Sequence, residues 1–258
     1  MGEVVAIFLA TTALAAFLVF APMSSADATD PEPLAAVEVE AVEVDGRLAL
    51  TDGSELCLPG IWVPATSERR GKKARWRSAW RKIIEDGAWV YRIDRPHQVD
   101  RYGCRIAAIE TSDGVPLDDA LLEAGWAMVN PTSMSDDDDV IDAKLDLEDR
   151  ARRAGRGIWR QADAMPKKAD NLMGWIGSRQ LVEGRVQRVS DNDRYVYLNF
   201  GRDWRTDFTV RLHRKMIEAQ GFDATNLDGK TLRVRGVLQD SRGPLIDVSN
   251  LKQIELLP

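Results

Sequence analysis

Short runs of alternating apolar and polar residues, separated by tight turns, constrain this chain most. Residues 37–44 read Val-Glu-Val-Glu-Ala-Val-Glu-Val, and the pairs Asp45-Gly46 and Asp52-Gly53 each lead into a further short apolar run. Alternation with a period of two is typical of a strand with one buried face, and Asp-Gly pairs are typical of turns between strands. The pattern predicts a mainly β fold.

We expect the first domain to span residues 37–161. Two more strands are predicted at residues 88–93 and 105–111. Helices are predicted at residues 67–86, from Pro116 to Gly125 and at residues 140–154. The first helix places Trp76 and Trp80 on one apolar face. The third helix is expected to bury the following face: Val140, Ala143, Leu147, Ala151 and Ala154.

A linker is expected at residues 162–174, followed by a second domain at residues 175–258. Five strand-like runs occupy residues 181–189, 195–200, 208–212, 231–239 and 245–248, and a helix at residues 214–220 follows the third run. This order is typical of an OB-fold barrel. The expected core residues alternate along these runs: Val186, Val196, Leu198, Val210, Leu232, Val234 and Ile246.

Composition excludes several classes of protein. The 258 residues are 44% hydrophobic and 29% charged, with a formal net charge of -6. These values exclude overall disorder, collagen and a polytopic membrane protein, and they argue against a generally basic nucleic-acid coat. Two cysteines and two histidines are too few for a typical four-ligand zinc module. We expect no metal and no cofactor.

The N-terminus predicts export. Residues 4–20 are apolar apart from two threonines, and Ala26-Asp27-Ala28 offers a signal-peptidase site, so residues 1–28 are expected to be a signal peptide. The segment Met1-Gly2-Glu3 lacks a basic residue, and a run of this length also suits a retained membrane anchor. Either reading places the rest of the chain in the periplasm, where disulfides persist.

Five motifs in order give the first domain a resemblance to the thermonuclease-like, or staphylococcal-nuclease-like, family. They lie at residues 44–46, 58–64, 100–103, 121–127 and 151–159, and they include Leu58-Pro59-Gly60-Ile61-Trp62-Val63-Pro64 and Ala154-Gly155-Arg156-Gly157-Ile158-Trp159. The resemblance implies a five-stranded OB-fold barrel with three helices. It also implies calcium-assisted hydrolysis of nucleic-acid phosphodiesters, with carboxylates holding the metal and arginines contacting the phosphate.

The residues that would carry this chemistry are replaced. The resemblance places Arg47 near the second acid of the first motif, Trp62 at the metal-binding aspartate, Ala65 at the catalytic glutamate, and Cys57 and Cys104 at the two arginines. Loss of one such group typically costs about 10²–10⁴-fold in rate. We therefore expect a pseudoenzyme, with compensation by neighbours such as Glu68, Arg105 or Asp45 as the alternative.

Because both family arginines contact one phosphate, the resemblance also implies that Cys57 and Cys104 face a common pocket. Export supplies an oxidising environment, so we predict a Cys57–Cys104 disulfide. Two buried free thiols are the alternative.

Two regions are candidate sites for nucleic acid or another anionic partner. The first is a basic segment that includes Arg69, Arg70, Lys72, Lys73 and Arg75; the alternative is a solvated helix face. The second lies in the C-terminal domain, where aromatic residues neighbour arginines as in single-strand binders. It comprises Tyr195, Tyr197, Trp204 and Arg205, with further charge from Arg185, Arg188, Arg211, Arg233 and Arg235. The alternative is that these aromatics pack between the barrel and its helix or at the interface between the domains.

Three functions remain open from the sequence. The first is an exported, non-catalytic binding or scaffold protein whose partner is an envelope protein or an anionic polymer, with membrane contact only through an uncleaved N-terminal segment. The second is a divergent periplasmic nuclease, which predicts at least two carboxylates and an arginine around one cleft. The third is a non-hydrolytic binder of single-stranded nucleic acid that acts through the second barrel.

Overall fold

The computed structural model describes residues 35–63, 75–92, 99, 104–133, 137–161, 164–203 and 206–258. The chain divides into Met1–Pro31 and a compact unit, Glu32–Pro258, that holds every described residue. This unit contains one hydrophobic core from residues 42–164 and Leu181, and another from residues 172–248. We call residues 35–161 the first half and residues 164–258 the second half.

None of the helices in the described ranges has the length and apolarity needed to cross a membrane, and the predicted signal peptide lies outside those ranges.

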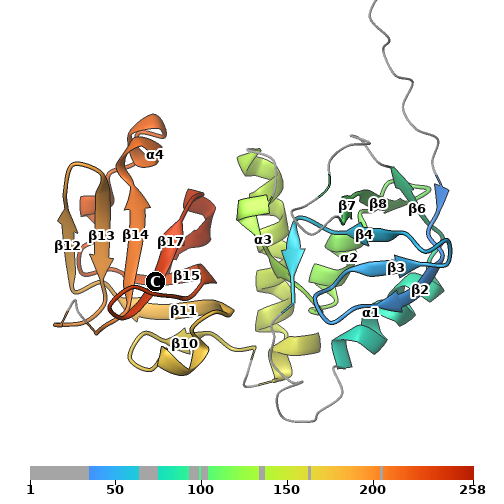
Figure 1. Ribbon diagram of the computed structural model, residues 1–258, viewed down its shortest axis with the longest axis horizontal. Helices are drawn as coiled ribbons and strands as arrows, with labels where there is room; N and C mark the ends of the chain where they lie inside the picture. The colour runs from blue at the N-terminus through green and yellow to red at the C-terminus, as the bar shows by residue number, and fades with distance from the viewer. Residues whose placement is uncertain are drawn as a thin grey trace, which may run out of the picture. The chain divides into compact units, whose positions relative to one another are not determined.

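Short strands make up the sheets of the first half (Figure 1). They are β1 (Ala35–Ala36), β2 (Val39–Val42), β3 (Leu48–Leu50), β4 (Glu55–Cys57), β5 (Ile61–Trp62), β6 (Trp89–Arg92), β7 (Arg105–Ile106), β8 (Ala108–Thr111) and β9 (Met128–Val129). They pair in the orders β2-β3-β4-β7, β1-β6-β8 and β5-β9, and only β4 and β7 run parallel. Two residues separate β1 from β2 and one separates β7 from β8, so the first two sheets join into one circuit of pairings.

Three helices accompany these strands: α1 (Arg75–Asp86), α2 (Leu117–Glu123) and α3 (Asp138–Arg153). α1 buries Trp76, Trp80 and Ile84 and packs against β2 (Figure 1), which confirms the predicted face. Its predicted beginning at residues 67–74 lies outside the described residues. α2 ends at Glu123, two residues before the predicted end at Gly125, where φ is +75° and the glycine is packed against the backbone of Arg156.

The predicted buried face of α3 is wrong for most of its residues. Val140 is 42% exposed, while Ile141, Lys144, Glu148 and Ala151 are buried. The prediction counted apolar residues only, whereas two charged residues of this helix are buried in ion pairs. Lys144 pairs with Asp118 at 2.7 Å and with Asp119, and Glu148 pairs with Arg235. The helix also begins earlier than predicted, because the Asp137 carboxylate accepts the backbone N–H groups of Asp139 and Val140.

The second half forms two sheets with the orders β10-β11-β15-β18 and β12-β13-β14-β17-β16. Its strands are β10 (Lys167–Lys168), β11 (Arg179–Arg185), β12 (Arg188–Asp191), β13 (Tyr195–Asn199), β14 (Thr209–His213), β15 (Thr231–Val237), β16 (Gln239–Asp240), β17 (Pro244–Val248) and β18 (Ile254–Leu256). The helix α4 (Arg214–Ala219) follows β14 as predicted (Figure 1). Short 3-10 turns lie at Pro131–Ser133, Gly157–Arg160, Met173–Trp175, Ala224–Leu227 and Leu251–Gln253.

The two halves share one order of pairing. In the second half, β12 continues β11 and β16 continues β15, and β11 and β15 pair with each other, so these pairings also form a circuit. β14 and β17 run parallel, as β4 and β7 do in the first half. The mainly β fold class is therefore confirmed, while closure into barrels stays a prediction. All seven residues expected in the second core are buried.

Candidate functional site

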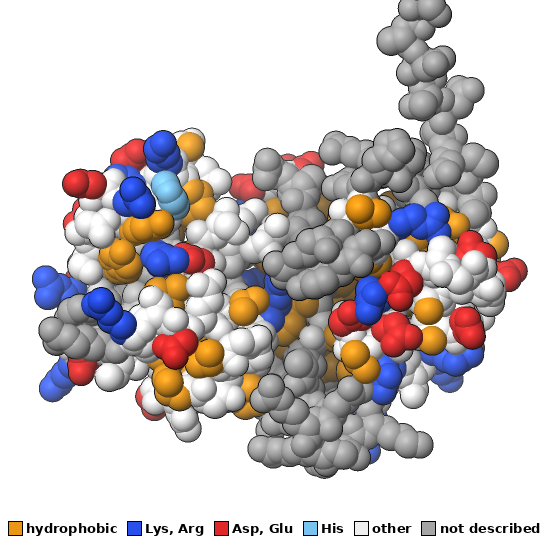
Figure 2. Space-filling view, viewed as in Figure 1, with side chains coloured by type: hydrophobic (Ala, Val, Ile, Leu, Met, Phe, Trp, Pro, Cys, Tyr) orange, Lys and Arg blue, Asp and Glu red, His pale blue; other side chains and the backbone are white. Residues whose placement is uncertain are grey.

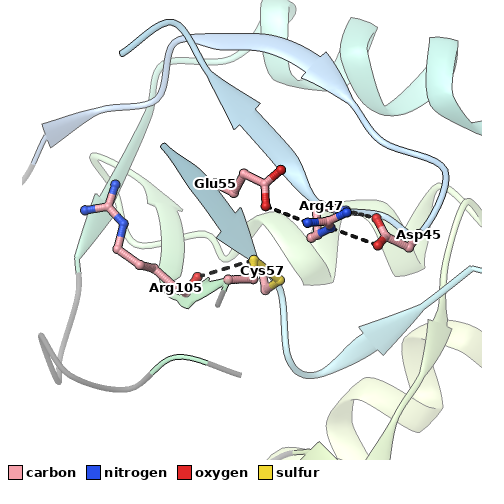
Figure 3. The surroundings of a disulfide bond; sticks show 6 residues. Asp45, Arg47, Glu55, Cys57 and Arg105 are labelled. Atoms are coloured by element: carbon pink, nitrogen blue, oxygen red, sulfur yellow. Dashed lines mark hydrogen bonds and ion pairs between the residues drawn. A yellow bond between two sulfur atoms is a disulfide. The ribbon is translucent and has the colours of Figure 1, made fainter. Parts of the chain in front are cut away.

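The structure joins the two cysteines (Figure 3). Cys57 and Cys104 form a disulfide with an S–S distance of 2.05 Å and a Cα–Cα distance of 5.9 Å. Cys57 ends β4 and Cys104 precedes β7, and the parallel pairing of these strands brings the two residues together. Cys104 is fully buried. The predicted disulfide is thus present, and the positions of two expected arginines carry a neutral crosslink instead.

Arg47 lies beside the disulfide and engages two carboxylates (Figure 3). Its Nε donates to Asp45 at 2.8 Å, and its Nη1 donates to Glu55 at 2.6 Å. Hydrogen bonding and charge attraction from Asp45, with a further contribution from Glu55, raise the pKa of the Arg47 guanidinium. A permanent cation therefore lies between the carboxylates of Asp45 and Glu55.

Arg105 does not replace a lost arginine. Its backbone belongs to β7 next to the disulfide, but its guanidinium points away from Arg47 and Glu55 (Figure 3). Its charge acts instead at the turn that holds Asp52. The pKa of Asp52 is lowered mainly by hydrogen bonds from Ser54, with a smaller contribution from the charge of Arg105.

Trp62 occupies the expected metal-binding position and makes contacts that an aspartate does not make. Its indole Nε1 donates to the carbonyl oxygen of Val129 at 3.0 Å. The guanidinium of Arg179, from β11 in the second half, lies 5.9 Å from the centre of the Trp62 ring and donates to the side chain of Asn130. Burial lowers the pKa of Arg179. This position is therefore part of a contact between the halves, and a cation already lies over it.

A buried ionic network adjoins this contact. Arg235 of β15 donates to both oxygens of Glu148 on α3, at 2.9 and 3.1 Å, and it also pairs with Glu255. Arg233 pairs with Glu255 at 2.8 Å and with Glu183 at 2.6 Å. Arg233 and Arg235 are only 6% and 2% exposed, so the expectation that they add charge to a binding surface is wrong. Their partners are distant in sequence, and the alternation of apolar and polar residues along β15 does not predict this pairing.

The aromatic candidates of the second half lie on the outer face of its five-stranded sheet. Tyr195 and Tyr197 are half-buried, with their rings 6.2 Å apart, and Arg211 lies 4.9 Å over the Tyr195 ring. They face away from the core residues that alternate with them on β13. Arg75 is exposed at the beginning of α1. The other candidates lie outside the described residues: Ala65, Arg69, Arg70, Lys72, Lys73, Trp204 and Arg205.

Comparison with known families bears on the first half alone. Residues 55–161 match the family described as staphylococcal nuclease homologue. This segment is a staphylococcal-nuclease-like domain. No curated protein matches the chain. The matched domain contains the disulfide and Trp62, while Asp45 and Arg47 lie before it and the second half lies after it.

Proposed function

We propose that this chain is an exported, non-hydrolytic staphylococcal-nuclease-like protein that acts as a binding or scaffold module. The observation that carries the proposal is the Cys57–Cys104 disulfide, because it stands where the resemblance expects the two phosphate-contacting arginines. A disulfide can neither neutralise charge on phosphorus nor donate a hydrogen bond to it. The nuclease-like domain then serves as a folded platform for an envelope protein or an anionic polymer.

The remaining donors do not fit a calcium site. Calcium takes six to eight oxygen ligands. Trp62 offers none, and Arg47 occupies the space between the carboxylates of Asp45 and Glu55. Within the described ranges, His, Cys, Asp and Glu side chains form no group of three or more that could hold a metal.

One observation favours the nuclease alternative. Asp45, Arg47 and Glu55 form the kind of cluster that a relocated active site needs, with two carboxylates and an arginine. Both carboxylates are paired with Arg47, however, and the side chains of Asp45, Arg47 and Glu55 are 52%, 32% and 38% exposed. We read them as a surface ion-pair network.

The test is a cleavage assay with purified full-length protein on plasmid DNA, single-stranded DNA and RNA, with and without calcium. We expect the same background rate for the wild type and for the variants Asp45→Asn and Glu55→Gln. Calcium-dependent cleavage that either variant abolishes would overturn the proposal and support the divergent nuclease.

Export has its own test. A disulfide is compatible with an oxidising compartment. Cleavage after Ala28 predicts that the mature chain begins at Thr29. Mass spectrometry of protein from the periplasmic fraction measures this terminus. An intact Met1 in the membrane fraction would indicate the anchor instead, and recovery in the cytoplasm with two titratable thiols would contradict export.

A further inference from the structure

A hollow of about 650 Å³ lies on the outer face of the second half's five-stranded sheet. Its floor follows the strand register, in which Arg188, Asn199 and Thr209 form one row and Ser190, Tyr197 and Arg211 form the next. The residues between these rows point to the opposite side and fill the second core. The hollow therefore forms on the face of the sheet, and the segments that precede β14 and β17 complete its walls.

Guanidinium groups dominate the charge around this hollow. Arg188, Arg202, Arg211 and Arg242 all line it, and three of them are exposed. Arg211 is neutralised by Asp247, which accepts from its Nε at 2.6 Å. Among the described residues, Arg188, Arg202 and Arg242 have no carboxylate within ion-pair distance.

The acidic residues of the lining offset only part of this charge. Asp191 pairs with Arg214, and the carboxylate of Asp207 accepts the backbone N–H of Asp203 at 2.7 Å. The residues from 175 onwards carry 14 Lys and Arg against 11 Asp and Glu, in a chain whose net charge is -6. Figure 2 shows Lys and Arg side chains over the β12–β14 region of this half. The hollow is thus a local basic site in an acidic protein.

The hollow also offers surfaces for a flat apolar group. Tyr197 lies in its floor, and Pro244 and Leu245, which are largely buried, also line it. The Tyr195 ring continues the aromatic surface beside Tyr197. Guanidinium groups suit phosphates, and aromatic rings stack on unpaired bases. A polymer that exposes phosphates and planar bases together is a single-stranded nucleic acid, whereas an anionic polysaccharide lacks the planar group.

We propose that this hollow binds single-stranded nucleic acid, with Arg188, Arg202 and Arg242 contacting phosphates and Tyr197 stacking on a base. The site is separate from the nuclease-like domain and does not depend on whether that domain hydrolyses phosphodiesters. It uses neither Trp204 nor Arg205, which the sequence singled out and which lie outside the described residues.

The experiment measures fluorescence anisotropy of a labelled 12-nucleotide oligothymidylate titrated with full-length protein in EDTA, which removes divalent metal ions. Arg188→Gln and Arg242→Asn should each weaken binding about 10-fold, because each removes a charge-assisted contact. Each should also reduce the slope of log K against log salt by about 0.7. Arg150→Gln is the matched control, since Arg150 is an exposed arginine of α3 without a described ion-pair partner.

Two further variants separate stacking from charge. Tyr197→Leu should weaken binding by about 5- to 100-fold, and Tyr197→Phe should retain it, because the ring and not the hydroxyl provides the stacking surface. Thermal unfolding midpoints confirm that each variant is folded. Absence of binding, or equal loss in Arg150→Gln, would overturn the proposal. Tighter binding of heparin that is insensitive to Tyr197→Leu would assign the hollow to anionic polysaccharide instead.

Discussion

At the scale of single residues, Arg235 is a charged side chain that is almost completely buried. Its side chain is 3% exposed and is matched by Glu148, also 3% exposed, and by Glu255. Glu148 accepts in addition the backbone N–H of Val129 at 2.6 Å. Burial alone lowers the pKa of Arg235, but the two carboxylates outweigh it and raise the pKa, so the guanidinium is charged at every accessible pH.

We predict that Arg235→Met lowers the free energy of unfolding by about 3–5 kcal/mol, because it leaves Glu148 buried without its cation. The double variant Arg235→Met/Glu148→Gln should recover at least half of this loss, since glutamine keeps an acceptor for Val129 and carries no charge. Arg81→Met, which removes an exposed pair with Glu85, should cost no more than about 1 kcal/mol. Urea unfolding measures all three. Equal losses for the single and double variants would show that packing, and not charge, sets the cost.

Glu255 makes part of this stability dependent on pH. Burial raises its pKa, but the charges of Arg235 and Arg233 outweigh burial and hold the pKa below the ordinary value of 4.5. A lowered pKa in the folded state stabilises the protein above pH 4.5, and this contribution is lost as the pH falls further through the folded-state pKa. The difference in free energy of unfolding between wild type and Glu255→Gln should therefore be constant near neutral pH and shrink below about pH 4.5. A difference that stays constant to about pH 3 would contradict this.

At the scale of elements, the disulfide fixes the parallel pair β4 and β7. It closes a loop spanning 47 residues in sequence, for which chain-entropy estimates give about 4 kcal/mol of stabilisation. We predict that Cys57→Ala/Cys104→Ala lowers the free energy of unfolding by about this amount. Dithiothreitol should destabilise the wild type and leave the double variant unchanged. Two titratable thiols in denatured, non-reduced protein would contradict the bridge.

The elements also show what the sequence can and cannot predict. Strands and the second core follow from local alternation, so residues such as Val196 and Ile246 were predicted correctly. The buried face of α3 was not, because Lys144 and Glu148 are buried only when Asp118 and Arg235 arrive from elsewhere in the chain. The disulfide was implied by the resemblance and not by spacing. The hollow depends on the register between strands, and nothing in a single strand's pattern reveals that Arg188 and Arg242 line the same space.

At the scale of the whole compact unit, polar contacts join the two halves. Besides Arg235–Glu148, they include Arg179 with Asn130, Lys252 with Asp142 and Asn250 with the carbonyl of Pro131. Contacts between domains are usually weak enough to allow independent motion unless the interface is large and apolar. Here the buried Arg235–Glu148 ion pair couples the halves in place of a large apolar interface. Opening the contact would separate the two charges. We infer that the halves open together.

Native-state hydrogen exchange tests this coupling, because it assigns an opening free energy to each amide. In the wild type, the slowest amides of α3 and β15 should share one opening free energy. In Arg235→Met, the protection of the two elements should diverge by at least about 1–2 kcal/mol, since the ionic contact no longer ties α3 to the second half. Arg81→Met should leave the two values equal, because its ion pair lies within α1. Different values in the wild type would mean that the halves open independently and that the buried pair stabilises their contact without making their unfolding cooperative.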